Sequence, residues 1–394
     1  MSQKLVSRSP DLSCLLADGY DIEVRPSGPL LLKGVPYVNS RKEVRYGILA
    51  SELDVAGETT STPKTHVAYF IGDYPCDVDG SALPGVTPNA NKALDKDITL
   101  NHSLSRKPTI GSYQNYHEKM TTYVAIISSP AHAIDPTVKA KSFPTVVPAD
   151  GESVFNYLDT AATKAGIVVA NSKLESQRVG IVGVGGTGSY VLDLVAKTVV
   201  AEIHLFDRDV FLNHSAFRAP GAASLGELTK KPLKVSYLKD LYSKMRKGIF
   251  AHECFVDETT VEQLWNLTFV FLCIDKGKPK QLIVEHLEQW GIPFVDAGMG
   301  VQLVDNALMG ILTVTTSTEK KRDHLRNRVA FGDGEGDNEY SRNVQIADLN
   351  ALNAALAVIK WKKLCGYYHD LAHEHFTAYT ISRNQLLNED KHDA

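Results

Sequence analysis

A glycine-rich stretch near the middle of the chain limits the fold more than any other feature. Residues 178–209 read RVGIVGVGGTGSYVLDLVAKTVVAEIHLFDRD, which predicts a strand, a glycine turn, a helix and a second strand that ends in acid. Glycine permits the tight turn and lets backbone N–H groups approach a phosphate chain, and the helix adds its positive N-terminal end. A plain strand-to-helix turn is the alternative, and the acid at Asp207 disfavours it because an acid there can bind ribose hydroxyls.

Strand and helix patterns alternate after this stretch. Such alternation predicts a mostly parallel sheet with helices on both faces, an α/β fold of the Rossmann-like type. The predicted strands are residues 178–184, 201–207, 250–256, 269–274 and 293–297. The predicted helices are residues 189–199, 232–246, 280–290 and 346–364. The polar residues 315–343 change from basic to acidic and glycine-rich, which predicts a mobile loop.

The first part of the chain has a different pattern. Runs of aromatic and β-branched residues between turn residues predict a smaller β-rich α+β domain. Its predicted strands are residues 30–38, 43–53, 65–72 and 121–128, and residues 77–96 read as a loop. The stretch PTVVPADGE at 144–152 predicts a linker, and a helix is expected over residues 153–174. We therefore expect an accessory domain over residues 1–150 and the α/β domain over residues 151–394.

Composition excludes several classes of protein. The chain has 394 residues, of which 43% are hydrophobic and 22% charged, an ordinary globular balance. The formal net charge of −4 and the lack of a long apolar run predict no nucleic-acid partner and no membrane. The five cysteines form no CxxC pair, which fits a reducing cytoplasm and argues against a structural zinc site.

Charged residues follow the predicted strands of the α/β domain. The glycines of the loop are Gly183, Gly185, Gly186 and Gly188, and the charged candidates are Asp207, Asp209, Arg218, Lys234 and Asp275. All of them should meet near the carboxyl edge of the sheet, where open α/β proteins bind ligands. Two cations and several acids around a phosphate chain favour ATP with magnesium over a nicotinamide dinucleotide. Each candidate also has a structural alternative, as a surface, capping or turn residue.

Together these motifs resemble the family of ThiF, MoeB and the ubiquitin-activating enzymes, over residues 153–364. The resemblance implies a Rossmann-like adenylation domain that adenylates the C-terminal glycine of a ubiquitin-like protein. It implies that the glycine loop faces the ATP phosphates, that Asp207 binds the ribose and that Asp209 lies in the adenylation pocket. It also implies that Arg218 and Lys234 grip the phosphates and that Asp275 binds magnesium. Family members commonly form symmetric homodimers.

The sequence departs from the family pattern at Ser215. The family usually has Asn at this position, in the motif that here reads HSAFR. A serine can still donate a hydrogen bond, but over a shorter reach, so adenylation could be weakened, or Asn213 could substitute through a shifted loop. Besides an adenylating enzyme and an NAD-dependent oxidoreductase, a third possible function is that of a non-catalytic scaffold, which binds ATP without adenylating a substrate.

The second departure concerns the acceptor of the activated glycine. Ubiquitin-activating enzymes transfer it to a cysteine, but residues 317–343 contain none, and Cys273 lies in an apolar strand where it is expected to be core. The enzyme could stop at the adenylate, pass the acyl group to a conjugating-enzyme-like partner, or use a hydroxyl such as Ser341 or Ser317. A hydroxyl is a poor nucleophile unless a base activates it. Of these outcomes we favour transfer that does not use a local cysteine.

Two further features have weaker implications. His369 and His373, in HDLAHEH with His375, could share a helix face as metal ligands or form a solvated helix end. A loop cysteine beside acids, Cys76, should have a raised pKa and is not expected to be a nucleophile.

The N-terminal region resembles an uncharacterised domain fused to bacterial members of the family. These occur beside a ubiquitin-like protein, a conjugating-enzyme-like protein and a peptidase, which implies a recruitment role.

Overall fold

The computed structural model describes residues 3–25, 27–88, 92–95, 98–145, 148, 151, 153–275, 277–331 and 344–392. The chain divides into two compact units, Met1–Val169 and Ala170–Ala394. The predicted fold class is confirmed, with an antiparallel β-rich unit followed by a largely parallel α/β unit. The assignment of an accessory domain to residues 1–150 and an adenylation domain to residues 151–394 stays a prediction.

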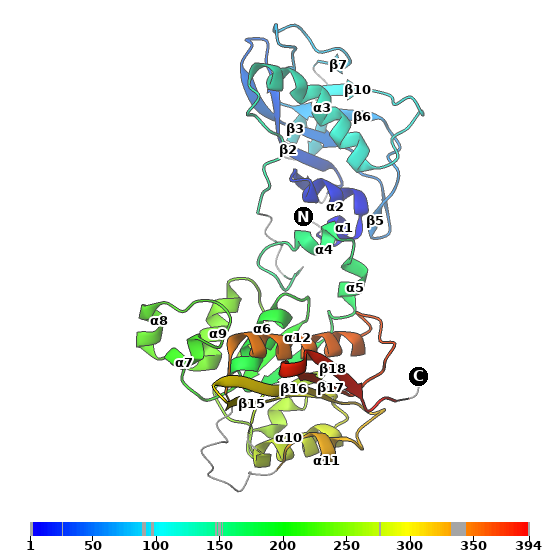
Figure 1. The fold of residues 1–394 in the computed structure, drawn as a ribbon. Coiled ribbons are helices and arrows are strands. Elements are labelled where there is room, and N and C mark those ends of the chain that lie inside the picture. Colours follow the sequence, from blue (N-terminus) through cyan, green and yellow to red (C-terminus); the bar gives the residue numbers. More distant parts are fainter. Residues whose placement is uncertain are drawn as a thin grey trace. The chain divides into compact units, whose positions relative to one another are not determined.

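The N-terminal unit is built on a six-stranded antiparallel sheet in the order β1-β2-β3-β6-β10-β7 (Figure 1). These strands are β1 (Asp21–Val24), β2 (Leu30–Val38), β3 (Val44–Ser51), β6 (Val67–Ile71), β10 (His102–Ser105) and β7 (Val86–Thr87). Short two-stranded pairs are β4 (Val55–Ala56) with β5 (Thr59–Thr60), and β8 (Lys92–Asp95) with β9 (Ile98–Leu100). The helices of this unit include α1 (Gln3–Arg8), α2 (Pro10–Ala17), α3 (Tyr116–Ile134) and α4 (Thr160–Lys164).

One predicted strand of this unit is wrong. Residues 121–128 lie inside α3 (Tyr116–Ile134), whose buried side chains pack on the sheet. Asn115 caps the helix by accepting a hydrogen bond from the Glu118 N–H. The buried residues Tyr116, Met120, Tyr123, Val124, Ile127 and Ala131 recur at helical spacing. The cap and this apolar stripe override the local preference of a β-branched run for strand. The helix expected over residues 153–174 is also largely absent, since only α4 and α5 (Val168–Ser172) form there.

The C-terminal unit has an eight-stranded mixed sheet in the order β13-β12-β11-β14-β15-β16-β17-β18. The first five strands are parallel: β13 (Ile249–His252), β12 (Glu202–Phe206), β11 (Arg178–Val182), β14 (Phe269–Leu272) and β15 (Phe294–Val304). The last three continue antiparallel: β16 (Ala307–Ser317), β17 (Phe376–Thr380) and β18 (Gln385–Glu389). This order places the glycine loop after the central strand β11, where ligands bind in such sheets.

Helices cover both faces of this sheet, as Figure 1 shows for α6 and α12 on one face and α10 on the other. The helices are α6 (Gly186–Ala196), α7 (Asn213–Ala216), α8 (Leu225–Lys230), α9 (Lys234–Ser243), α10 (Gly277–Gln289), α11 (Leu325–Arg328) and α12 (Ala347–Leu364), with 3-10 turns η1 (Val261–Leu264) and η3 (Ile381–Arg383). Successive side chains of β14 pack into hydrophobic cores on opposite faces of the sheet. Phe269 and Phe271 pack into one core, and Val270 and Leu272 pack into the other. The full burial explains why this strand reads as a continuous apolar run.

Most predicted elements of this unit match, with two differences. The strand expected at residues 293–297 is the start of the longer β15, which forms a hairpin with β16. The polar segment 315–343 was expected as a loop, but it begins with the end of β16 and includes α11. Residues 332–343 lie outside the described residues.

Candidate functional site

The glycine loop is a turn that side chains would obstruct. Gly183 has φ +82°, donates its N–H to the Phe206 carbonyl at 2.8 Å, and would place a Cβ 2.6 Å from the Cys273 carbonyl oxygen. A Cβ on Gly188 would overlap the Gly183 carbonyl oxygen. These two glycines therefore satisfy the tight turn and the close contact between helix and strand that the motif requires.

The N-terminal end of α6 is open to a ligand. A Cβ on Gly185 would meet no heavy atom within 4 Å, so the backbone there is open on that side. Helix α6 has no side-chain cap and no acid in its first turn. Its first N–H groups and its dipole can therefore interact with an anion.

Asp207 connects the second strand to the glycine loop. Its side chain is buried, one oxygen accepts the Val184 N–H at 3.0 Å, and the other accepts the Asp209 N–H at 2.8 Å. Each carboxylate oxygen has a second lone pair that remains available for a hydroxyl group. The predicted ribose-binding acid is thus held in a fixed position beside the loop.

Lys234 and Asp209 form the charged centre of this edge. The Lys234 Nζ lies 2.6 Å from an Asp209 oxygen and 3.8 Å from an Asp207 oxygen. The Lys234 side chain is only 7% exposed, whereas that of Asp209 is 55% exposed. The Lys234 N–H also donates to the Asp209 carbonyl at 2.8 Å. The structure therefore excludes the alternative of a solvated helix lysine at position 234.

Arg218 has a buried nitrogen atom without a protein partner. Its Nε is buried, and no group in the described part of the chain bonds to it. Asn350 connects this arginine to the glycine loop, since its Oδ1 accepts the Thr187 hydroxyl at 3.1 Å and its Nδ2 donates to the Arg218 carbonyl at 3.5 Å. Asn350 is fully buried and packs against Gly186. Sequence analysis missed Asn350 because it lies in an Ala- and Leu-rich helix that reads as core.

Ser215 lies inside the short helix that precedes Arg218. Its side chain is 4% exposed and accepts the Leu212 N–H at 3.4 Å, which caps the start of α7. Its hydroxyl proton is still available for donation. Asn213 lies at the first position of α7 and is exposed. Ser215 thus stabilises the start of α7, whereas the Asn213 side chain remains accessible to solvent.

Asp275 follows β14 at the same edge. It is exposed, and within the described residues it makes no hydrogen bond or ion pair. Close by, Lys280 of α10 and Asp296 of β15 form a buried ion pair at 2.7 Å, with side chains 6% and 5% exposed. Burial raises the pKa of Asp296, whereas the Lys280 ammonium lowers it. Sequence analysis missed this pair, since nothing in the pattern shows that these positions face each other.

Four of the five cysteines are poor candidates for a nucleophile. Burial raises the pKa of four of the thiols, to about 12 for Cys365. The other three are Cys76, Cys254 and Cys273. Cys273 packs against the core of the C-terminal unit, as expected. Ser317 is 1% exposed, which disfavours it as an acyl acceptor, and Ser341 lies outside the described residues.

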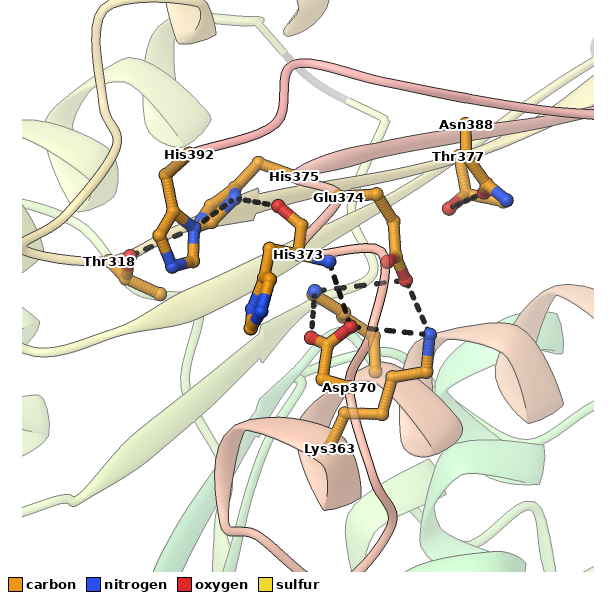
Figure 2. A network of polar contacts seen from close by, with 10 residues as sticks. Thr318, Lys363, Asp370, His373, Glu374, His375, Thr377, Asn388 and His392 are labelled. Atoms are coloured by element: carbon orange, nitrogen blue, oxygen red, sulfur yellow. Dashed lines mark hydrogen bonds and ion pairs between the residues drawn. The ribbon is translucent and has the colours of Figure 1, made fainter. Parts of the chain in front are cut away.

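The histidine segment is not a helix. Helix α12 ends at Leu364, and His373 has φ +49°, a left-handed conformation that a helix does not contain. Figure 2 shows that these residues form a polar network instead: Asp370 accepts the His373 N–H at 3.0 Å, and Lys363 donates to Glu374 at 2.8 Å. Among the residues that the structure describes, no group of three or more His, Cys, Asp or Glu side chains is placed to hold a metal ion.

His375 is a deeply buried histidine of this network. It is 1% exposed, and one of its ring nitrogens lies 3.0 Å from the Thr318 hydroxyl. Burial lowers its pKa to about 4, with a further contribution from the charge of Lys360. The ring is therefore neutral at pH 7, which suits a structural role. No helix within the described ranges is both long and apolar enough to cross a bilayer.

Comparisons with known proteins agree with this architecture. The ThiF family model matches residues 160–359, more than half of the chain, and a domain of unknown function (DUF6791) matches residues 10–160. A comparison with curated proteins finds no match.

Solved structures that partly match this chain include E. coli MccB with MccA-N7isoASN, at 17% identity and a TM-score of 0.47, covering 60% of this chain and 70% of that one. The microcin C7 biosynthetic enzyme MccB with N-formylated MccA has 18% identity and a TM-score of 0.47, covering 60% and 71%. PaaA has 17% identity and a TM-score of 0.45, covering 56% and 75%. At these values the likeness assigns no roles to residues of this chain.

Proposed function

This chain belongs to the ThiF family, and on that premise we propose that it uses ATP to adenylate the C-terminal glycine of a ubiquitin-like protein. The observation that carries the proposal is the position of Lys234. Its ammonium group is buried beside Asp207 and Asp209, at the sheet edge that also holds the glycine loop. A buried cation at this place suits a bound phosphate chain better than it suits the stability of the apoprotein.

In the proposed reaction, a carboxylate oxygen of the terminal glycine forms a bond to the α-phosphorus of ATP. The bond between that phosphorus and the bridging oxygen breaks, and pyrophosphate leaves with its electron pair. Two anions must approach each other, so the repulsion between them has to be neutralised. The compensating positive charge would come from the open N–H groups of α6, from Lys234 and from the Arg218 guanidinium, whose Nε has no partner among the described residues.

The residues at this edge also fit a magnesium ion. Magnesium keeps several waters and is usually held by one or two carboxylates together with substrate phosphates. Asp275 is exposed and has no partner among the described residues, so its carboxylate is available for this role. The ion would neutralise phosphate charge when bound.

The acyl group then moves toward a conjugating-enzyme-like partner without a local cysteine. The raised thiol pKa values of Cys254, Cys273 and Cys365 support this proposal, because the reactive species is the thiolate. A symmetric homodimer through the adenylation unit is part of the same proposal.

ATP–pyrophosphate exchange tests the proposed function. Purified protein is mixed with ATP, labelled pyrophosphate and a ubiquitin-like protein that ends in glycine, and the wild type is compared with Asp275→Ala. Exchange that requires both the partner and Asp275 supports adenylation. If ATP binds but no such partner supports exchange, the chain is instead a non-catalytic scaffold, which the Ser215 departure permits. Tight NADH binding would point to an oxidoreductase.

We also propose that the N-terminal unit recruits a partner protein of this reaction. The test is deletion of residues 1–150, with partner binding measured directly. Unchanged binding of both the ubiquitin-like and the conjugating-enzyme-like protein would refute the recruitment role.

A further inference from the structure

The N-terminal unit contains a groove along α3 that the proposed reaction does not use. It has a volume of about 420 Å³, a size that suits a small-molecule ligand. The residues that line it are Tyr20, Thr121, Val124, Ala125, Ser128, Ser129, His132, Lys139, Ala140 and Lys141. It runs beside the helix from Thr121 to His132, a distance of roughly 16 Å at the helical rise.

The floor of the groove is apolar apart from one hydroxyl group. Tyr20, Val124 and Ala140 are each less than 8% exposed and supply the apolar surface. Ser128 is 4% exposed, and its hydroxyl makes no hydrogen bond to another described residue. The Ser128 hydroxyl is therefore available to form a hydrogen bond with a ligand in the groove.

The rim of the groove carries two lysines. His132, Lys139 and Lys141 are exposed and line it, and no acidic side chain does so. Lys141 is partly compensated, since its Nζ lies 3.7 Å from Asp18 and 5.2 Å from the centre of the Tyr20 ring. Asp135 lies near His132. Lys139 has no ion-pair partner among the described residues, so the groove retains uncompensated positive charge.

One wall of the groove is held in place by backbone contacts. Lys141 forms an antiparallel bridge with Tyr20, and the Phe143 N–H donates to the Gly19 carbonyl at 2.9 Å. Phe143 has φ +47°, an uncommon conformation for a residue with a side chain, which the surrounding contacts must maintain. A wall fixed in this way keeps the groove formed before a ligand arrives, which lowers the cost of binding.

We propose that this groove binds a small amphipathic anion, with a carboxylate or phosphate group on a short apolar body. The anionic group would bind to Lys139 and Lys141, and the apolar body would lie on Val124 and Ala140. Every lining residue belongs to the N-terminal unit, and the proposed adenylation reaction uses none of them.

Ligand-observed NMR titration of the full chain tests the proposal. The probes are hexanoate, hexyl phosphate and the neutral hexanamide. At least one of the two anions should bind at least tenfold more tightly than the amide, since charge-assisted hydrogen bonds are the strong ones. The double variant Lys139→Ala, Lys141→Ala should weaken anion binding at least tenfold, and Ser128→Ala should weaken it less. Lys107→Ala is the matched control, because Lys107 is an exposed lysine of the same unit that does not line the groove.

The two anions distinguish the sources of the ligand: preference for hexanoate indicates a carboxylate, and preference for hexyl phosphate a phosphate ester. Equal binding of the amide and both anions would overturn the proposal, as would anion binding that the double variant leaves unchanged. Failure of both anions to bind at about 10 mM would also overturn it, since such an affinity corresponds to less than about 3 kcal/mol. Unfolding curves of the variants verify that the N-terminal unit remains folded.

Discussion

The carboxylate of Asp207 accepts the backbone N–H of Val184 at 3.0 Å, so the acid at the end of β12 and the glycine loop after β11 form one structural unit. The same carboxylate orients Asp209 through its N–H, and Asp209 in turn pairs with Lys234. Asp207, Asp209 and Lys234 are therefore linked to one another and to the glycine loop by direct hydrogen bonds and ion pairs.

Gly188→Ala should destabilise the C-terminal unit by about 3 kcal/mol, because the new Cβ would overlap the Gly183 carbonyl oxygen. The control is Gly226→Ala in α8, where the nearest atom to a Cβ lies 4.0 Å away and alanine favours helix. Thermal unfolding should show a large loss for the first variant and no loss for the second. Equal stability of the two would contradict the packing described for the loop.

Lys234→Met should lower ATP–pyrophosphate exchange by about 100- to 1000-fold, the range seen when one group that stabilises transition-state charge is removed. The control is Lys230→Met, since Lys230 is exposed at the end of α8. Exchange rates are measured at saturating ATP. A loss that is the same in both variants would show that the position of the buried ammonium group is unimportant.

Asn350→Ala should weaken ATP binding about tenfold. The substitution removes the amide group that bonds both to Thr187 in the glycine loop and to the Arg218 carbonyl. Asn353→Ala is a stringent control, since Asn353 is equally buried on the same helix but donates to the Gly298 carbonyl. Both variants should lose about 1–3 kcal/mol of stability. Titration calorimetry should show weaker ATP binding by the Asn350 variant than by the Asn353 variant. Equal ATP affinities of the two variants would show that Asn350 does not contribute to the site.

The C-terminal unit should lose stability as the pH falls from 6.5 toward 4. His375 has a pKa of about 4 in the folded chain, below the value of about 6.5 expected after unfolding. Between these values the unfolded chain binds one more proton, which favours unfolding by about 1.4 kcal/mol per pH unit. His375→Gln should flatten this dependence, whereas His214→Gln, at an exposed position, should not. Denaturant unfolding at several pH values measures both.

The N-terminal unit should gain stability as the pH rises from 8 to 9.5. Burial lowers the pKa of Lys119 to about 8, below the value of about 10.4 expected after unfolding. The unfolded chain binds the extra proton in this range, so raising the pH favours the folded state by up to about 2 kcal/mol. Native-state hydrogen exchange of α3 reports on this unit. Lys119→Met should remove the gain and Lys107→Met should retain it; a gain that persists without Lys119 would refute the assignment.

Much of the α/β unit could be predicted because its pattern is repetitive and local. The predicted strand at residues 269–274 contains β14, since full burial on both faces produces an apolar run. The glycine turn could be identified because only glycine fits its backbone and its close contacts. The ThiF resemblance that rests on these motifs is confirmed.

Contacts between distant segments could not be predicted. Asn350 reaches the glycine loop from α12, and the helical spacing of its neighbours indicates only a buried face. The pairing of Lys280 with Asp296 depends on how α10 lies on the sheet. The β-branched residues at 121–128 favour a strand locally, whereas the N-cap at Asn115 and the apolar stripe favour the helix that forms. The roles assigned to the site residues stay predictions until the variants are measured.

The buried pair of Lys280 and Asp296 restricts how the sequence can diverge. Loss of one partner would leave an uncompensated charge in the core, which typically costs about 3–5 kcal/mol, whereas replacing both by apolar residues of similar size can be neutral. Single replacements should therefore be purged by selection, and natural homologues should exchange the two positions together. Correlated substitution of residues 280 and 296 in an alignment would be the evolutionary record of this contact.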